Sequence, residues 1–458
     1  MGKLFGTDGI RGIAGEELTA DLAFRLGLVL SRVLTEEKKG KGKVIIGKDT
    51  RLSGDMFESA ITAGLCAMGS DVYLLGVVPT PAVAYLVRQT GADAGVMISA
   101  SHNPSEYNGI KIFGSKGYKL PDEIEDRIEA LLLQKDLDLT PGGYGIGRVL
   151  SGEGLIDGYE AHIASVYVKR ENLTKIKRVL FDLSNGSASA TAKYVFSHDN
   201  FPGFECHFMA YDPDGININR NCGSTQMNAL CRYVVDERYD IGIAFDGDAD
   251  RCLMCDENGE ILDGDQIISA FASEMKKQGI LKNNTVVVTQ MTNLGFHQFM
   301  KQEGITVRLT DVGDRYVLEE MLRCGSVIGG EQSGHVILLD HATTGDGQIT
   351  AATALSLLAR YPEKKASELF GRMKRLPQVI VNVTVPVEMK KSLADHPAVK
   401  AVRSRIEATL GDSGRILIRP SGTEPLVRIM LEGNDPDRLA EYAEEIKNVI
   451  GETVSCGQ

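Results

Sequence analysis

The chain has 458 residues, of which 43% are apolar, and a formal net charge of −12 at pH 7. At roughly 100 to 200 residues per domain, this length predicts three or four domains. The acidic balance argues against a general nucleic-acid-binding surface, and no apolar run reaches the ~18 residues of a membrane-spanning helix. The N-terminal segment lacks a signal-peptide core, so we expect a cytoplasmic protein whose eight cysteines are reduced.

Three segments repeat one pattern: a β-branched run, a polar loop, a helical stretch and a second extended run. They are residues 43–78, residues 177–196 with 204–215, and residues 284–314. In the first segment, Phe57, Ile61, Leu65 and Met68 recur at helical spacing. Strands that alternate with helices predict α/β domains with mixed or largely parallel sheets and right-handed crossovers. We therefore expect three related α/β domains.

The repeated pattern is interrupted at three places along the chain. The segment DLTPGGYGIG (138–147) breaks the first unit, and DGDADR (246–251) closes the second. After residue 370 the spacing changes, and extended runs at 377–386 and 414–433 precede a terminal helical stretch at 436–451. These features predict a final α+β domain. We place the four domains at residues 1–150, 151–255, 256–368 and 369–458.

The segment MISASHNPSEYNGIKIF (97–113) places Ser101 beside His102 after an apolar run. A hydrolase triad would need His102 to reach Ser101, but adjacent side chains of an extended segment point to opposite faces. The segment also lacks the G-x-S-x-G elbow of such enzymes. Two interpretations of Ser101 remain: it is a phosphate carrier, or it is an ordinary serine in an Asn-Pro turn. Lys111, ten residues later, would serve a phosphate carrier as a cation or a proton donor.

Three aspartates at alternate positions follow an apolar strand in FDGDADR (245–251). An extended backbone would direct the carboxylates of Asp246, Asp248 and Asp250 to one side. Converging anions repel one another unless a cation lies among them, and hard oxygen ligands suit Mg²⁺. A calcium EF-hand is excluded because Arg251 occupies the position of its required glycine. We predict a Mg²⁺ site that could also bind an oxygen of a phosphate on Ser101; the alternative is a solvated acidic turn.

Two later motifs carry groups suited to a phosphosugar. In GGEQSGHV (329–336), Glu331, Ser333 and His335 alternate, so they would share one side of an extended segment. In IRPSGTEPLVRIM (418–430), two guanidiniums with hydroxyls and loop amides form a candidate phosphate cradle. A structural histidine and a simple hairpin turn are the respective alternatives.

Four motifs in one order make a sharper signal than any single one: SASHNP, DGDADR, GEQSGH and RPSGTEPLVR. Together they resemble the α-D-phosphohexomutases over essentially the whole chain. The stretches LFGTDGIRG, VGDRYVLE and GEQSGHVILLDHATTGDG resemble specifically the bacterial branch that acts on glucosamine phosphates. The resemblance implies four domains around a central cleft, three of them with a common α/β topology.

The resemblance also implies a role for each matching residue. Ser101 would be phosphorylated and would bind Mg²⁺ together with Asp246, Asp248 and Asp250. Arg11, Lys111 and Arg251 would flank the transferring phosphoryl group. The resemblance leaves the role of His102 open, and the simplest role is to shape the phosphoserine loop. Glu331 and Ser333 would bind sugar hydroxyls, with His335 beside them. The phosphate that does not react would be gripped by Arg419, Ser421, Gly422, Thr423 and Arg428.

The implied activity is that of an isomerase, an intramolecular phosphotransferase that interconverts glucosamine 6-phosphate and glucosamine 1-phosphate. Glucosamine 1,6-bisphosphate would be the intermediate, and that compound or glucose 1,6-bisphosphate the activator. The product would feed UDP-N-acetylglucosamine and peptidoglycan synthesis. The expected partner is a phosphosugar, not a nucleic acid or a membrane, and the resemblance is compatible with a homodimer.

Several alternatives stay open. Gln332 stands where relatives acting on glucose or mannose phosphates carry other residues, so a phosphoglucomutase or phosphomannomutase is the nearest alternative. Ala249 stands where the family often has glycine, a change that should preserve the metal ligands. A metal-dependent sugar phosphatase and an inactive phosphosugar-binding protein are more distant alternatives. A general base must deprotonate the accepting hydroxyl, and the sequence does not decide between Lys111 and His335.

Overall fold

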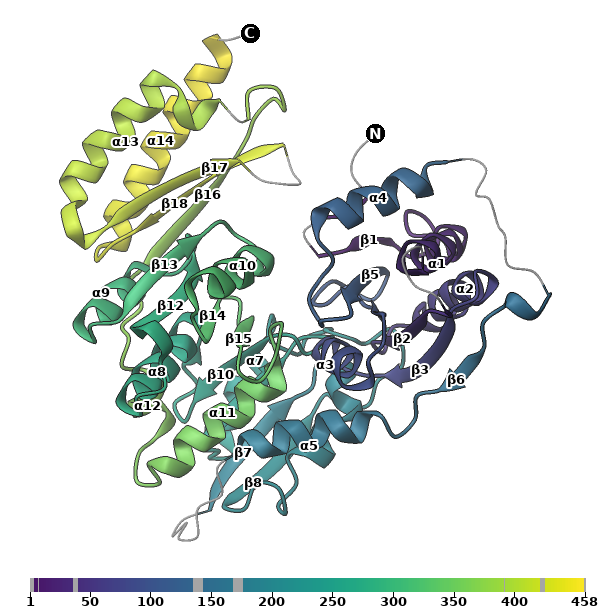
Figure 1. Ribbon diagram of the computed structural model, residues 1–458. Helices are drawn as coiled ribbons and strands as arrows, with labels where there is room; N and C mark the ends of the chain where they lie inside the picture. The colour runs from purple at the N-terminus through teal and green to yellow at the C-terminus, as the bar shows by residue number, and fades with distance from the viewer. Residues whose placement is uncertain are drawn as a thin grey trace. The chain divides into compact units, whose positions relative to one another are not determined.

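The computed structural model describes residues 4–6, 8–35, 40–134, 143–167, 176–390, 392–420 and 425–456. The chain divides into two compact units, one comprising Met1–Met291 with Ile305–Arg372 and the other Thr292–Gly304 with Met373–Gln458. Within the described residues, the first unit contains three β-sheets and the second contains one. Strands and helices alternate as the sequence predicts (Figure 1). The domain boundaries at residues 150, 255 and 368 stay predictions.

The first sheet has six strands in the order β1-β5-β4-β2-β3-β6. Its strands are β1 (Ile10–Ile13), β2 (Lys43–Lys48), β3 (Asp71–Val77), β4 (Ala94–Ile98), β5 (Tyr107–Gly114) and β6 (Val149–Ser151). The accompanying helices are α1 (Ala20–Thr35), α2 (Gly54–Ala67), α3 (Thr80–Thr90) and α4 (Asp122–Leu132), with a 3-10 turn at Gly143–Gly145. Strands β2, β3, β4 and β6 pair in parallel, whereas β5 is antiparallel to β1 and β4.

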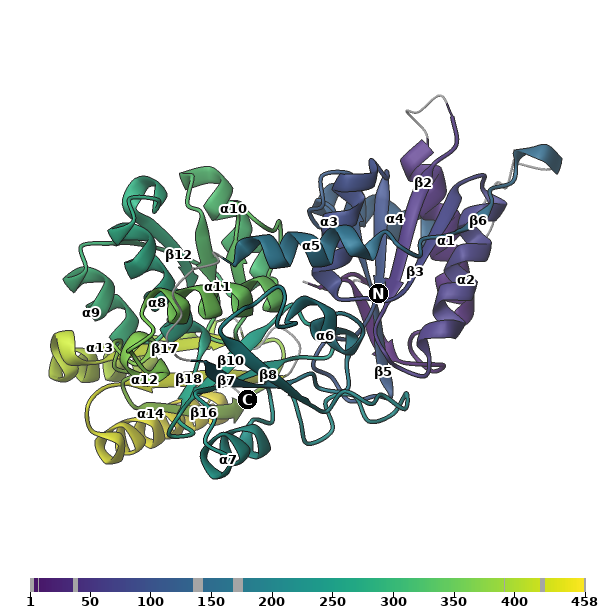
Figure 2. The same ribbon diagram turned by 90° about the horizontal axis from the view of Figure 1, so that it is seen from below.

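Helices cover both faces of this sheet: α3 lies on one side, and α1 and α2 lie on the other (Figure 2). The predicted helical stripe is confirmed for Phe57, Ile61 and Leu65, which are buried on α2, whereas Met68 caps the end of the helix and is half-buried. They pack in one core with Val44 and Ile46 of β2. Ser101 follows the end of β4, and Lys111 lies within the neighbouring strand β5, where it pairs with Met97 of β4.

The second sheet has five strands in the order β11-β10-β9-β7-β8. Its strands are β7 (Lys177–Asp182), β8 (Phe204–Met209), β9 (Ile241–Phe245), β10 (Cys252–Asp256) and β11 (Ile261–Leu262). Helices α5 (Ile156–Val166), α6 (Ala192–Val195) and α7 (Asn228–Asp236) accompany it, with a 3-10 turn at Ser187–Ala190. All five residues of β9 are buried, and this strand delivers the chain into the aspartate motif. Cys252 and Cys255 are buried on β10 as free thiols.

The third sheet has four strands in the order β13-β12-β14-β15. Its strands are β12 (Thr285–Thr289), β13 (Thr306–Thr310), β14 (Ile328–Gly330) and β15 (Val336–Leu338). Helices α8 (Gly264–Lys277), α10 (Asp314–Cys324), α11 (Gly347–Arg360) and α12 (Ala366–Phe370) belong to this part, with a 3-10 turn at Lys282–Asn284. Helix α9 (Leu294–Gln302) lies between β12 and β13 in the chain, but it belongs to the second compact unit.

The second unit confirms the expected α+β composition. Its antiparallel sheet has the order β16-β18-β17, formed by β16 (Gln378–Thr384), β17 (Arg415–Pro420) and β18 (Leu426–Glu432). Helices α13 (Pro397–Leu410) and α14 (Pro436–Cys456) lie on one side of the sheet (Figure 1), and 3-10 turns occur at Leu393–Asp395 and Gly411–Ser413. The buried Glu432 carboxylate accepts hydrogen bonds from Arg415 Nε (2.6 Å) and from the N–H of Leu294 (3.0 Å). These bonds join α9 to the sheet.

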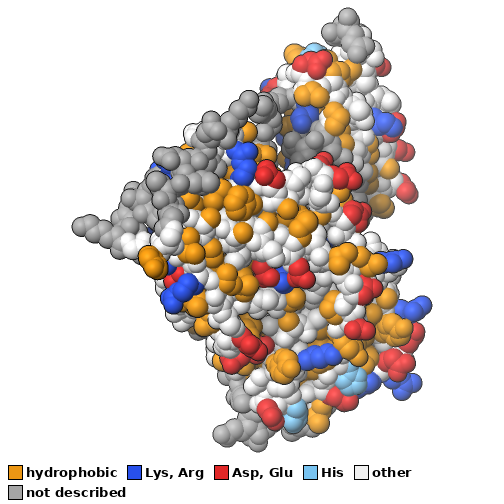
Figure 3. All heavy atoms as spheres, turned by 90° about the vertical axis from the view of Figure 1, so that its right-hand side faces the viewer, with side chains coloured by type: hydrophobic (Ala, Val, Ile, Leu, Met, Phe, Trp, Pro, Cys, Tyr) orange, Lys and Arg blue, Asp and Glu red, His pale blue; other side chains and the backbone are white. Residues whose placement is uncertain are grey.

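On the face drawn in Figure 3, Lys and Arg side chains lie among Asp and Glu side chains. None of the helices in the described ranges combines the length and apolar character that crossing a membrane requires.

Candidate active site

Ser101 lies in the turn that follows β4, with its backbone in the left-handed region at φ 53°. The residue is 1% exposed. Its N–H donates to Ser99 Oγ (2.9 Å), and its hydroxyl donates to Asp246 Oδ2 (2.6 Å). The structure therefore brings the predicted phosphate carrier against the predicted metal ligands.

The expectation that His102 points away from Ser101 is wrong. His102 Nδ1 lies 3.2 Å from Ser101 Oγ, because the left-handed backbone at Ser101 removes the alternation of an extended segment. A hydroxyl has one hydrogen, and here Asp246 accepts it, so Nδ1–H is the donor to Oγ. Burial, together with Arg251 and Arg11, lowers the pKa of His102 to about 4, which keeps the imidazole neutral near pH 7. With Asp246 as the acceptor of the Ser101 hydrogen, His102 contacts Oγ as a donor, which is not the arrangement of a hydrolase triad.

Asp246, Asp248 and Asp250 converge as predicted, but for a different reason. One carboxylate oxygen from each lies within 4.8 Å of the others, and all three residues are buried. The segment is a turn, not an extended strand: Ala249 has φ 54°, and its N–H donates to the Asp246 carbonyl (3.1 Å). The turn, not strand alternation, gathers the carboxylates.

The carboxylate cluster has the chemistry of a divalent cation site. Within the described part of the chain, the buried Oδ1 atoms of Asp248 and Asp250 have no hydrogen-bond partner. Burial, reinforced by the charges of Asp250 and Asp248, raises the pKa of Asp246 well above its ordinary value. A cation would relieve both the repulsion and the missing hydrogen bonds, and an all-oxygen donor set suits Mg²⁺. The residues present therefore fit the metal.

Lys111 projects from β5 into this cluster and is 1% exposed. Its Nζ lies 2.8 Å from Asp248 Oδ2, 3.1 Å from Asp8 Oδ2 and 3.4 Å from Asp250 Oδ2. Burial by itself would lower the pKa of Lys111, but the three carboxylates outweigh it and raise the pKa well above its ordinary value. The three carboxylates therefore hold Lys111 as a cation in this arrangement. Thr80 Oγ1 makes the other contact to Asp248 Oδ2 (2.5 Å).

The two predicted arginines also border the cluster. The Arg11 guanidinium donates to Asp8, which in turn accepts from Lys111. The N–H of Arg251 donates to Asp246 Oδ1 (3.1 Å), and its side-chain Nε is buried with no hydrogen bond to any described residue. Burial opposes the charge of Arg251, but Asp246, Asp250 and Glu331 outweigh it and raise the pKa of the guanidinium. Both arginines thus place positive charge beside the carboxylates.

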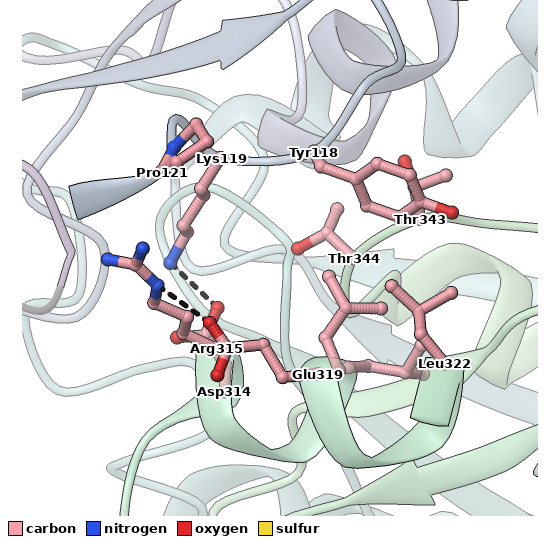
Figure 4. A pocket seen from close by; sticks show the side chains of 11 residues that line it. Tyr118, Lys119, Pro121, Asp314, Arg315, Glu319, Leu322, Thr343 and Thr344 are labelled. Atoms are coloured by element: carbon pink, nitrogen blue, oxygen red, sulfur yellow. Dashed lines mark hydrogen bonds and ion pairs between the residues drawn. The ribbon is translucent and has the colours of Figure 1, made fainter. Parts of the chain in front are cut away.

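Residues that the sequence analysis did not single out extend this network. Lys119 Nζ donates to Asp8 Oδ1 (2.5 Å) and to Asp314 Oδ2 (2.7 Å). Asp314 Oδ2 in turn lies 3.6 Å from His335 Nε2. Figure 4 shows Lys119 reaching Asp314 at the wall of a cavity of about 230 Å³ between residues 118–121 and helix α10. Asp8 and Asp314 lie inside the motifs LFGTDGIRG and VGDRYVLE, and their place in these motifs is the sequence feature that could have predicted them.

The predicted sugar loop connects β14 to β15 as a tight turn, so the extended geometry expected for it is wrong. The N–H of Glu331 donates to the His335 carbonyl (3.0 Å), and that of Gly334 donates to the Glu331 carbonyl (3.0 Å). Ser333 Oγ and both ring nitrogens of His335 are buried without a hydrogen-bond partner in the described ranges. The loop adjoins the metal turn, because the N–H of Cys252 donates to the Gly334 carbonyl (3.0 Å). Unpaired polar atoms of this kind suit sugar hydroxyls.

In the second unit, the segment after residue 414 forms a β-hairpin whose strands carry the two predicted arginines. Arg419 of β17 lies directly opposite Arg428 of β18. Arg428 Nε donates to Asn382 Oδ1 (3.1 Å), whereas Arg419 Nε is buried with no hydrogen bond to another described residue. Burial and Arg428 lower the pKa of Arg419. Facing cations repel, so the pair suits an anion such as phosphate. Ser421, Gly422 and Thr423 lie outside the described residues.

Comparison with known proteins supplies independent findings. Models of the four domains of phosphoglucomutase/phosphomannomutase match residues 2–138 (domain I), 157–259 (domain II), 263–376 (domain III) and 380–449 (C-terminal domain). The phosphoglucosamine mutase of Acetivibrio thermocellus is 49% identical over 453 residues, which is 99% of both chains. That of Clostridium novyi is 48% identical over 458 residues and 100% of both chains.

Solved structures agree in fold. A phosphoglucomutase/phosphomannomutase family protein from Burkholderia thailandensis has a TM-score of 0.80 at 22% identity, covering 98% of this chain and 97% of its own. An N-acetylphosphoglucosamine mutase from Aspergillus fumigatus, solved with GlcNAc-6P and magnesium, has a TM-score of 0.70 at 18% identity, covering 98% and 96%. Sequence, domain order and fold therefore agree, and the chain belongs to the phosphoglucomutase/phosphomannomutase family, the α-D-phosphohexomutases.

Proposed function

We propose that the protein interconverts glucosamine 6-phosphate and glucosamine 1-phosphate, the activity of a phosphoglucosamine mutase. Relatives that bear this name match the whole chain at 48% to 49% identity. The observation that carries the chemistry is the 2.6 Å hydrogen bond from Ser101 Oγ to Asp246 Oδ2, at the edge of a three-carboxylate cluster. A phosphate on Ser101 would meet a divalent cation there.

The cofactors follow from the same cluster. Asp246, Asp248 and Asp250 would hold Mg²⁺, which would neutralise charge on the transferring phosphoryl group. Ser101 would carry that group as phosphoserine. Lys111, Arg11 and Arg251 add fixed positive charge around it, which suits phosphoryl transfer because catalysis there rests on positioning and charge stabilisation.

Each half-reaction breaks one P–O bond and forms another. When the phosphoryl group leaves Ser101 for a sugar hydroxyl, the sugar oxygen loses a proton and Ser101 Oγ gains one. Lys111, which the surrounding carboxylates keep charged, would supply the proton at Oγ. His335 is the better candidate for the base, since its ring nitrogens are buried without hydrogen-bond partners among described residues and Asp314 lies 3.6 Å from Nε2. The second half-reaction runs in reverse with the other phosphate of the glucosamine 1,6-bisphosphate.

The other predicted residues complete the binding of substrate. Glu331 and Ser333 would bind sugar hydroxyls, and Arg419 and Arg428 would bind a phosphate of the sugar. The product would supply UDP-N-acetylglucosamine and peptidoglycan synthesis in the cytoplasm. A homodimer, and the lack of nucleic-acid or membrane partners, stay predictions.

The test separates the mutase from its alternatives. Glucosamine 6-phosphate is supplied with Mg²⁺ and a trace of glucosamine 1,6-bisphosphate, and both glucosamine 1-phosphate and free phosphate are measured. Formation of glucosamine 1-phosphate without stoichiometric free phosphate is expected, whereas stoichiometric phosphate alone would identify a phosphatase. Glucose 6-phosphate and mannose 6-phosphate at matched concentrations then test the sugar. A higher kcat/KM for either of them would overturn the amino-sugar assignment.

A further inference from the structure

Arg51 lies between β2 and α2, and its side chain is 0% exposed. Its guanidinium donates to four backbone carbonyls of one short segment. One terminal nitrogen donates to Ser101 O and Asn103 O, both at 2.9 Å. The other donates to Tyr107 O (3.0 Å) and to Pro104 O. A single buried side chain therefore ties down the turn from residue 101 to residue 107.

The counter-ion of Arg51 holds the same turn from a second direction. Arg51 Nε donates to Asp49 Oδ2 (2.9 Å), and Ser99 Oγ donates to that same oxygen (2.6 Å). Ser99 Oγ also accepts the N–H of Ser101 (2.9 Å). The Asp49–Arg51 pair is thus connected to both backbone polar groups of Ser101, directly at the carbonyl and through Ser99 at the N–H.

This anchoring matters because the backbone of Ser101 is strained. A residue other than glycine is disfavoured in the left-handed region, so Ser101 at φ 53° needs contacts that hold it there. Asn219 Nδ2 adds a further bond to Ser101 O (2.9 Å). Gly247 of the metal turn approaches the same carbonyl so closely that a Cβ atom would lie 2.6 Å from it. Small displacements of this peptide would therefore move Oγ relative to Asp246.

We propose that Arg51, together with Asp49, is a positioning residue for phosphoryl transfer: it holds the 101–107 turn so that Ser101 Oγ lies against the metal-binding carboxylates. The inference rests on the proposed function, in which Ser101 carries the phosphoryl group. A lysine cannot replace this arginine, because an ammonium group has three donors on one atom whereas the planar guanidinium spreads five. The Arg51 side chain uses its fork to reach carbonyls on two sides.

The full chain with Arg51→Lys is compared with the parent in the glucosamine 6-phosphate assay. We expect kcat to fall about 100-fold, since a displacement of about 1 Å costs that much, while KM changes less than about threefold. Asp49→Asn should also lower kcat more than it changes KM, but the loss of kcat should be smaller than in Arg51→Lys. Arg25→Lys is the matched control: Arg25 also donates to two carbonyls, of Leu132 and Gln134 (2.6 Å each), but it joins α1 to the end of α4. Its kcat should stay at the parent value.

Chemical rescue separates positioning from general stability. In Arg51→Ala, millimolar methylguanidinium should restore part of kcat in a saturable way, and methylammonium should not. Two outcomes would overturn the inference. One is a parent-like kcat in Arg51→Lys; the other is a loss of kcat in Arg51→Lys and Asp49→Asn that is fully explained by the fraction of unfolded protein. Ser101→Ala identifies which proposal fails: if it also keeps parent activity, the phosphoserine mechanism is wrong, whereas an inactive Ser101→Ala beside a fully active Arg51→Lys rejects only the role of Arg51.

Discussion

The hydroxyl of Ser101 donates a 2.6 Å hydrogen bond to Asp246 Oδ2, although the two residues are 145 positions apart in the chain. The bond joins the turn after β4 to the turn after β9, which belong to different sheets. Both residues are buried. Phosphorylation of Ser101 would replace the shared hydrogen by a phosphoryl group next to three carboxylates.

Ser101→Ala should lower kcat at least about a thousandfold, because it removes the oxygen that carries the phosphoryl group. The coupled assay for glucosamine 1-phosphate measures this loss. Ser105→Ala, four residues later in the same turn, is the control and should keep the parent rate. Near-normal turnover in Ser101→Ala would reject the phosphoserine assignment.

Asp248→Asn should raise the Mg²⁺ concentration needed for half-maximal activity by about 10- to 100-fold, since it removes a charged ligand from the cluster. Mg²⁺ titration of activity and calorimetric Mg²⁺ binding both report the change. Asp256→Asn is the matched control, because Asp256 is buried on β10 but lies outside the cluster. Equal titrations for Asp248→Asn and the parent would exclude Asp248 as a ligand.

Arg428→Ala should raise KM at least about tenfold with little change in kcat, since a charged hydrogen bond to phosphate present throughout the reaction contributes uniform binding. Steady-state kinetics with glucosamine 6-phosphate give both constants. Arg438→Ala removes an exposed arginine of the same unit and should leave KM unchanged. A KM in Arg428→Ala equal to that of the parent contradicts the phosphate clamp.

Asp346 should make the protein less stable as the pH rises. Burial raises the pKa of Asp346 to about 7, despite hydrogen bonds from the N–H of Ile349 and the hydroxyl of Tyr159. A carboxyl whose folded-state pKa exceeds its ordinary value resists ionisation, so its contribution is fully present below pH 4 and is lost as the pH rises through about 7. The loss is on the order of a few kcal/mol.

Asp346→Asn isolates this effect, because asparagine stays neutral, keeps an acceptor for Ile349 and can donate to Tyr159. Thermal unfolding at pH 5 and pH 8 gives the midpoint, Tm, for both proteins. The Tm of the parent should fall more between these values than the Tm of the variant. Parallel shifts in the two proteins would show that Asp346 does not titrate with a raised pKa.

Ala249 should tolerate glycine but not valine. Its φ of 54° strains any residue with a Cβ, and a β-branched side chain most of all. Ala249→Gly relieves that strain but removes a buried methyl group, and these two effects on stability oppose each other. Its free energy of unfolding should therefore lie within about 1 kcal/mol of that of the parent. Ala249→Val should lose at least about 2 kcal/mol and weaken Mg²⁺ binding. Denaturant unfolding and Mg²⁺ titration test both; a stable Ala249→Val would contradict the strain.

Local patterns were sufficient for the secondary structure and for most of the candidate residues. Phe57, Ile61 and Leu65 line the buried side of α2, and the buried strand β9 leads directly into the aspartate turn. These features depend on residues within a few positions of one another, so periodicity and residue type predict them. Motif order likewise predicted Ser101, the three aspartates and the arginine pair as candidate site residues.

Local patterns failed where backbone conformation depends on distant contacts. Extended geometry was assumed at Ser101, at the aspartates and at the sugar loop, and each of these segments is a turn. Arg51 and Asn219, from other parts of the chain, donate to the carbonyl of Ser101, and Asp49 acts on its N–H only through Ser99. No propensity of a serine predicts the left-handed conformation of Ser101.

Residue types and their order along the chain thus predicted the fold class, the carboxylate cluster and the candidate phosphate carrier. The pairing of Lys111 with Asp8, the bridge from Lys119 to Asp314 and the contact of His102 with Ser101 became evident only in the folded chain. The physical reason is that these contacts join residues from separate strands and turns. Burial removes water from their charged and polar groups, so each group must pair with a neighbour that the tertiary packing places beside it.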